Sequence, residues 1–148
     1  MMLIVYPALF YYDAAAQAKY FVTFPDFENS ATQGKNIQDA LEMASEYLGI
    51  IVADLIDTQN HVPRPSDINI LDLKETNPFK NDDDFQLEYD PEKSFVTLIY
   101  VDINNYLGSQ NPVKKTLTIP KWADDLGKKH SLNFSKTLED AIVEKVNH

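Results

Sequence analysis

The sequence Lys114-Lys115-Thr116-Leu117-Thr118-Ile119-Pro120 alternates polar and apolar side chains near the C-terminus. Successive side chains of a β-strand point to opposite faces, so Leu117 and Ile119 line an apolar face and the two threonines a polar face. Pro120 suits the first position of a helix. This stretch is therefore expected to be an amphipathic strand that leads directly into a helix.

Two short amphipathic helices are expected after this strand. Trp122, Ala123 and Leu126 continue the apolar face, with acidic residues early and basic residues late in the first helix, as the helix dipole favours. Asn133 is expected to cap the second helix, whose apolar side holds Phe134, Leu138, Ala141, Ile142 and Val146. A lone strand leaves its backbone groups unpaired, and so small a unit lacks a core of its own. We therefore expect a homodimer that pairs this strand with its copy, and the sequence leaves open whether dimers assemble further.

This order of strand, helix, turn and helix resembles the ribbon-helix-helix fold of dimeric repressors. In that fold a two-stranded ribbon enters the major groove with its polar face toward the base edges, and the second helix begins near a phosphate. The resemblance implies that operator DNA is contacted by Lys114, Lys115, Thr116, Thr118, Asn133, Ser135 and Lys136. A strand-helix-helix appendage that only dimerises is the alternative, because threonine on a solvent-facing strand requires no function.

A change in charge separates this segment from the rest of the chain. Residues 1–110 contain 6 basic and 18 acidic residues, a net charge of −12, whereas residues 111–148 contain 7 and 5, a net charge of +2. The polar stretch 104–112, which contains glycine and proline, lies at this change. We therefore expect a domain at 1–103, a linker at 104–112 and a DNA-binding domain at 113–148. The acidic domain is suited to a basic protein partner and the tail to phosphates.

The first domain is expected to be α+β, with a β-sheet covered by one long helix. The patterns predict strands at 3–12 and 19–24, a short strand near 32–33, another at 68–73 and an interior strand at 95–101 that is apolar on both faces. Asn36 is the expected cap of the long helix, with Asp39 in the capping-box position and the end near Asp57. Residues 74–94 are polar and acidic and are expected to form a loop.

Several short blocks of the first domain resemble those of HicB antitoxins and occur in the same order. They are Tyr6-Pro7-Ala8-Leu9-Phe10, Tyr20-Phe21-Val22-Thr23-Phe24-Pro25-Asp26-Phe27, Thr32-Gln33-Gly34 and Asp39-Ala40-Leu41. The C-terminal stretches 118–122 and 133–135 are similar to the ribbon-helix-helix variants of the same family. Several independent short matches in one order are more specific than any one of them.

The resemblance implies a first domain with a degraded ribonuclease-H-like fold and no catalytic activity. It also implies a partner, the small basic HicA toxin, which is an mRNA-cleaving ribonuclease, and a complex that represses its own promoter. Because carboxylates attract a cationic surface, contacts to the toxin are expected from the first strands, the long helix and the acidic loop. The candidates are Glu42, Glu46, Asp54, Asp57, Asp82, Asp83 and Asp84.

No catalytic residue, metal site or cofactor is expected. The chain has no cysteine, its three histidines lie far apart in the sequence, and its four glycines are too dispersed for a phosphate-binding loop. The N-terminal apolar run is short and lacks a basic region, so neither a signal peptide nor a membrane span is expected, and the cytoplasm is the expected location.

Two alternatives to an antitoxin stay open at the level of sequence. The first is a ribbon-helix-helix repressor whose N-terminal domain binds a small ligand and needs no toxin. The second is a metal-dependent nuclease, because Asp13, Asp26, Glu28 and Asp102 lie near expected strand ends and ribonuclease-H-like catalysis needs clustered carboxylates.

Overall fold

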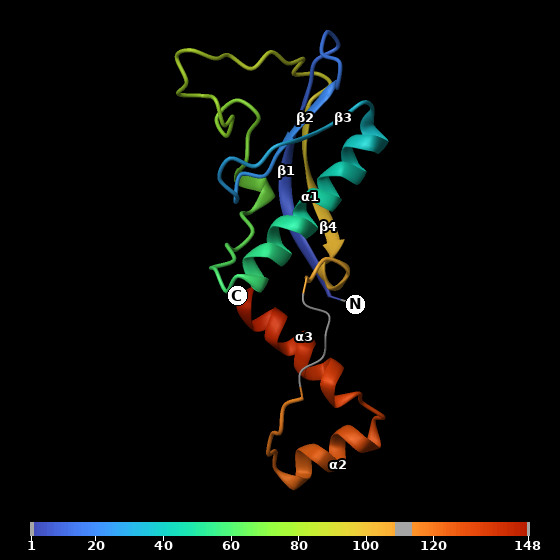
Figure 1. Cartoon of the computed structure of the whole chain (residues 1–148). Helices are drawn as coiled ribbons and strands as arrows, with labels where there is room; N and C mark the ends of the chain where they lie inside the picture. Colours follow the sequence, from blue (N-terminus) through green and yellow to red (C-terminus); the bar gives the residue numbers. More distant parts are fainter. Residues whose placement is uncertain (1, 109–113, 148) are drawn as a thin grey trace.

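The computed structural model describes residues 2–108 and 114–147 (Figure 1). Its N-terminal part holds a four-stranded antiparallel sheet in the order β3-β2-β1-β4. The strands are β1 (Leu3–Tyr12), β2 (Tyr20–Thr23), β3 (Thr32–Gly34) and β4 (Phe95–Asp102). The long helix α1 (Ile37–Asp57) covers one face of the sheet (Figure 1). A mixed α and β architecture with one long covering helix is therefore confirmed.

The core lies between the central strand β1 and α1. Side chains at even positions of β1, among them Tyr6 and Phe10, are buried in one cluster with Ala44 and Leu48 of α1. The opposite face of the sheet is partly covered by the segment 71–94, whose Phe79 and Tyr89 rings pack against Phe21 and Tyr11. There the Tyr11 hydroxyl donates to the Leu73 carbonyl at 2.7 Å. One face of the sheet therefore packs against α1, and the other packs in part against the segment that precedes β4.

The start of α1 follows the capping pattern in the sequence. The Asn36 side chain accepts a hydrogen bond from the Asp39 backbone N–H at 2.8 Å, and the Asp39 carboxylate accepts one from the Lys35 N–H at 2.9 Å. A Cβ at Gly34 would lie 2.4 Å from the Ala40 backbone, so only glycine lets β3 approach the helix this closely. The predicted start and end of this helix are confirmed.

Two of the strand predictions are wrong. The segment 68–73 contains the 3₁₀ helix η1 (Ile68–Ile70) and turns, because the side chain of Asp67 accepts from Asn69 N–H and that of Asp72 from Lys74 N–H. The second wrong prediction is the interior position of the strand at 95–101. This strand, β4, pairs with β1 alone and lies at the edge of the sheet. Its apolar side chains on both faces therefore do not come from an interior position.

Residues 104–108, the first part of the predicted linker, pack against the first domain. Residues Ile103–Asn105 form the 3₁₀ helix η2, and the Tyr106 ring lies so close to Gly49 that a Cβ there would be 2.6 Å from it. The Gly108 N–H donates to the Asp57 carboxylate at 2.6 Å. The rest of the predicted linker, residues 109–112, lies outside the described residues.

The C-terminal part contains an extended segment and two helices, α2 (Lys121–Lys129) and α3 (Phe134–Val146). Among residues 2–108 and 114–147, the predicted strand at 114–120 pairs with no other strand. Helix α3 runs back toward the first domain, and its Val143 is buried in the same cluster as Ile4 and Ile103 (Figure 1). Within residues 2–108 and 114–147, no helix is long and apolar enough to cross a membrane.

Candidate DNA-binding and partner-binding surfaces

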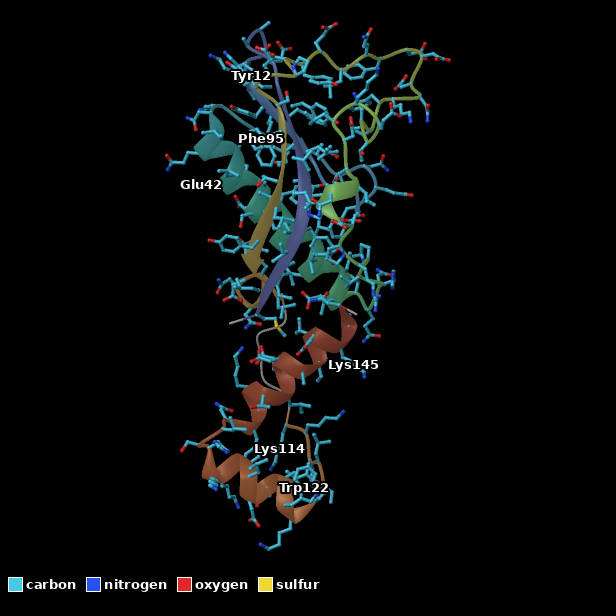
Figure 2. All side chains as sticks on the ribbon, turned by 180° about the vertical axis from the view of Figure 1, so that it is seen from behind. Tyr12, Glu42, Phe95, Lys114, Trp122 and Lys145 are labelled. Atoms are coloured by element: carbon cyan, nitrogen blue, oxygen red, sulfur yellow. The ribbon has the colours of Figure 1, made fainter. Side chains whose placement is uncertain are left out.

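Four residues of the predicted DNA-binding set lie in the extended segment before α2. Lys114, Lys115, Thr116 and Thr118 are all exposed, and Figure 2 shows the end of this segment with Lys114 and Trp122 labelled. Among the described residues, no backbone hydrogen bond involves residues 114–119. The segment therefore presents both its side chains and its backbone groups to a partner.

The remaining three residues of that set lie at the start of α3. The Asn133 side chain accepts from the Lys136 backbone N–H at 3.0 Å and so caps the helix, with the exposed Ser135 in its first turn. The Lys136 ammonium donates to Asp140 at 3.0 Å, and this hydrogen bond is the main cause that raises the pKa of Lys136. Asn133 and Ser135 are therefore exposed at the start of α3, whereas the charge of Lys136 is paired.

Internal ion pairs reduce the positive charge of the C-terminal part. Lys121 pairs with Asp125 at 2.8 Å and Lys128 with Asp124 at 2.8 Å. Within the described residues of this part, the lysines without a carboxylate in ion-pair range are Lys114, Lys115, Lys129 and Lys145. Lys114 and Lys115 precede α2, so half of these unpaired lysines lie on the predicted ribbon.

The apolar faces of the C-terminal part are exposed in the single chain. Trp122 is 69% exposed. The other large apolar side chains that are exposed here are Leu117, Ile119, Leu126, Leu132, Phe134, Leu138, Ile142 and Val146. The Phe134 ring packs over Gly127, where a Cβ would lie 2.5 Å from it, so the two helices meet closely at their turn. A monomer would leave this large apolar surface in water.

The predicted toxin-binding carboxylates fall on opposite sides of the sheet. Glu42, Glu46, Asp54 and Asp57 are exposed on α1, whereas Asp82, Asp83 and Asp84 lie in the loop that covers part of the other face. Asp57 accepts from Gly108, and Asp82 accepts from the Asp84 N–H at 2.9 Å. The structure therefore brings the helix group and the loop group into two separate acidic regions.

Two of the carboxylates that would serve a nuclease are engaged in hydrogen bonds within the fold. Asp26 accepts from both the N–H and the hydroxyl of Ser66. Asp102 accepts from the Met2 N–H at 3.1 Å, the main cause that lowers its pKa, and also from the Asn104 N–H. In the described part of the chain, no three acidic or histidine side chains come together as metal ligands.

A surface hollow near the β2–β3 connection bears on the ligand-binding alternative. It has a volume of about 490 Å³. Its lining combines aromatic side chains, among them Phe21, Phe27 and Phe79, with polar ones, among them Glu28 and Asn29. Its buried hydroxyl groups are engaged internally, because the Thr23 hydroxyl donates to the Ser30 carbonyl and the Ser30 hydroxyl donates to the Phe24 carbonyl. The polar side chains of the lining that lie outside these hydrogen bonds include Glu28 and Asn29, and these would have to orient a small ligand.

An exposed apolar strip on the sheet was missed at the level of sequence. Leu3 and Val5 of β1 and Leu98 and Tyr100 of β4 share the face that α1 does not cover, and all four are exposed. The signal was present in the continuous apolar run of β4, but an interior strand and an apolar edge strand have the same pattern.

Comparison with solved structures identifies the family. A chain of a toxin–antitoxin complex from Streptococcus pneumoniae is 60% identical and has a TM-score of 0.72, with 97% of this chain and 99% of that chain covered. A family model described as a HicB-like antitoxin of bacterial toxin–antitoxin systems matches residues 5–74. The chain belongs to the HicB-like antitoxin family.

A more distant HicB structure has the same fold. The antitoxin HicB of Burkholderia pseudomallei is 20% identical, with a TM-score of 0.55 over 97% of this chain and 99% of that chain. A search of curated proteins gives no significant match to this HicB-like chain. The two alignments extend over the C-terminal part as well as the sheet, so the whole HicB-like chain shares one architecture with these relatives.

Proposed function

We propose that this HicB-like chain neutralises a small basic HicA-like ribonuclease toxin through its N-terminal domain and represses its own operon through a dimeric C-terminal ribbon-helix-helix. The observation that carries the toxin-binding part is the 60% identity, over nearly the whole length of both chains, to a chain of a toxin–antitoxin complex. The net charge of −12 in residues 1–110 supports a cationic partner by charge complementarity.

The exposed C-terminal surface supports the dimeric DNA-binding part. Among the described residues, no backbone hydrogen bond involves residues 114–119, and the apolar faces of α2 and α3 are exposed in the single chain. Pairing of two such segments would satisfy the backbone, and packing of four helices would remove the apolar faces from water. The polar face of the resulting ribbon would carry Thr116 and Thr118, which can exchange hydrogen bonds with base edges.

Binding to a toxin tests the first part. The purified full chain is titrated into the toxin of the Streptococcus pneumoniae complex, and cleavage of a model mRNA by that toxin is followed. We expect a stable complex and loss of cleavage at equimolar chain. A chain that neither binds nor inhibits this toxin would refute the antitoxin proposal for this toxin class. Operator binding that a metabolite changes would then favour the ligand-responsive repressor.

Binding to the DNA upstream of the chain's own reading frame tests the second part. We expect Thr116→Ala and Thr118→Ala each to weaken specific binding by about 1–3 kcal/mol. Lys114→Ala should weaken binding to all sequences and lower the slope of log affinity against log salt by about 1. Lys145→Ala, at the far end of α3, is the matched control. Wild-type affinity in all three test variants would contradict the ribbon as the DNA-contacting element.

A further inference from the structure

The outer edge of β4 is an open template for another strand. The Ile103 N–H donates to the Met2 carbonyl at 3.1 Å, which fixes the phase of the β1–β4 ladder. The backbone N–H and C=O groups therefore point toward β1 at residues 95, 97, 99 and 101. They point away from the sheet at Val96, Leu98 and Tyr100. Among the described residues, one hydrogen bond reaches these outward groups, from the Ser45 hydroxyl to the Tyr100 carbonyl at 2.9 Å.

Several of the usual features that protect an edge are missing from β4. Its eight residues pair with β1 in continuous register without a bulge, and its sequence contains neither lysine nor proline. Leu98 is 49% exposed and Tyr100 is 67% exposed. Long, apolar and regular edges pair readily with other chains. The opposite edge of the sheet, β3, has only three residues and offers a much shorter template.

A groove with a carboxylate at its rim runs beside this edge. It is formed by Leu41, Glu42 and Ser45 of α1 together with Leu98, Ile99 and Tyr100 of β4. Figure 2 shows Glu42 beyond β4, on the side away from β1. Glu46 follows one helical turn later and is also exposed. An incoming strand would therefore find apolar pockets for alternate side chains and negative charge along one side.

From these observations we infer that the β4 edge and the α1–β4 groove are the docking site of the toxin, which adds an extended segment as a fifth strand beside β4. This inference rests on the proposed antitoxin function. A second copy of this chain is the less suitable occupant, since it would bring another 1–110 segment of net charge −12 against the same acidic rim. A basic protein gains from that charge and from main-chain hydrogen bonds to Leu98 and Tyr100.

The first test compares variants of the full chain in binding the Streptococcus pneumoniae toxin by calorimetry. Tyr100→Glu places a charge on the edge, and Leu98→Pro removes an outward N–H at a position where an edge strand tolerates proline. Leu98→Ala keeps that N–H, and Ile70→Glu changes a side chain that is 74% exposed on η1, on a different segment. We expect at least tenfold weaker binding for Tyr100→Glu and Leu98→Pro, and wild-type affinity for Ile70→Glu.

The second test measures amide exchange by NMR with and without the toxin. Strand addition predicts new protection of the outward Leu98 and Tyr100 amides, whereas the Ile99 and Val101 amides are already bonded to β1 in the free chain. Because this test needs no substitution, it decides the matter even where Leu98→Pro fails to fold.

The outcomes separate the two proposals. If the wild-type chain binds the toxin but the variants bind within twofold of it and the outward amides gain no protection, the docking site is wrong and the antitoxin function stands. If the wild-type chain does not bind, both fail for this toxin. If Tyr100→Glu changes the mass of the free chain in light scattering but leaves toxin affinity unchanged, the edge joins two copies and the inference is overturned.

Discussion

Burial of the Tyr6 ring makes the stability of this protein sensitive to alkaline pH. The side chain is 1% exposed and its hydroxyl donates to the Pro63 carbonyl. Burial, and secondarily the charge of Asp26, raises the pKa of Tyr6 to about 12. Burial also raises the pKa of Tyr11, which lies on the opposite face of the sheet. Both residues therefore hold their protons more tightly in the folded chain than in the unfolded chain.

The raised pKa of Tyr6 predicts a loss of stability at alkaline pH. Above pH 10 the unfolded chain releases the Tyr6 proton while the folded chain keeps it, so the free energy of unfolding is complete below pH 10 and falls as the pH rises toward 12. The Tyr6 share of that loss is on the order of 2–3 kcal/mol. Urea unfolding at pH 8, 10 and 11.5 should show a smaller pH-dependent loss in Tyr6→Phe than in the wild type. Tyr100→Phe, at an exposed ring, serves as control, and an equal loss in all three chains would contradict the account.

At the scale of elements, the start of α1 depends on one side chain. Asn36 satisfies the Asp39 N–H, which otherwise has no partner within the helix. We predict that Asn36→Ala lowers the free energy of unfolding by about 1 kcal/mol, whereas Asn36→Asp, which keeps an acceptor oxygen, stays within about 0.5 kcal/mol of the wild type. Chemical denaturation at pH 7 measures both. A similar loss in the two variants would show that the cap acts through something other than hydrogen bonding.

At the same scale of elements, β4 occupies an edge of the sheet although its sequence predicted an interior position. An uninterrupted apolar run is typical of a strand buried on both faces, and it predicted an interior position. The structure instead leaves Leu98 and Tyr100 exposed at a free edge. An apolar run on an exposed edge supports the proposed docking of a partner strand beside β4.

At the scale of the whole molecule, α3 joins the two parts of the chain. Val143 is 3% exposed and belongs to the cluster that also holds Ile4 and Ile103. We predict that Val143→Ala lowers the free energy of unfolding by roughly 2 kcal/mol and reduces amide protection in α3 more than in β1, because a cavity opens between the two parts. Lys145→Ala, at an exposed position two residues further along α3, is the control. Unchanged thermal stability of Val143→Ala would show that the contact contributes little in solution.

The sequence alone determined the features that rest on local patterns. Two β-rich apolar runs placed β1 and the first hairpin. Helical spacing and the Asn36–Asp39 pair set the limits of α1, and the order of short blocks pointed to the HicB family. These features depend on neighbours within a few residues, and local periodicity and capping encode them directly. The Asx-turn chemistry of Asp67 and Asp72 was equally local, yet the apolar residues between them suggested a strand.

Only the tertiary structure decided which residues share a surface. It put the carboxylates of α1 and those of the 82–84 loop on opposite faces, placed β4 at the edge, and brought α3 against the first domain. The physical reason is that strand order and packing partners depend on contacts between residues far apart in the chain. An apolar residue in the sequence indicates that its side chain avoids water. It does not indicate whether the chain's own fold or a partner protein covers that side chain.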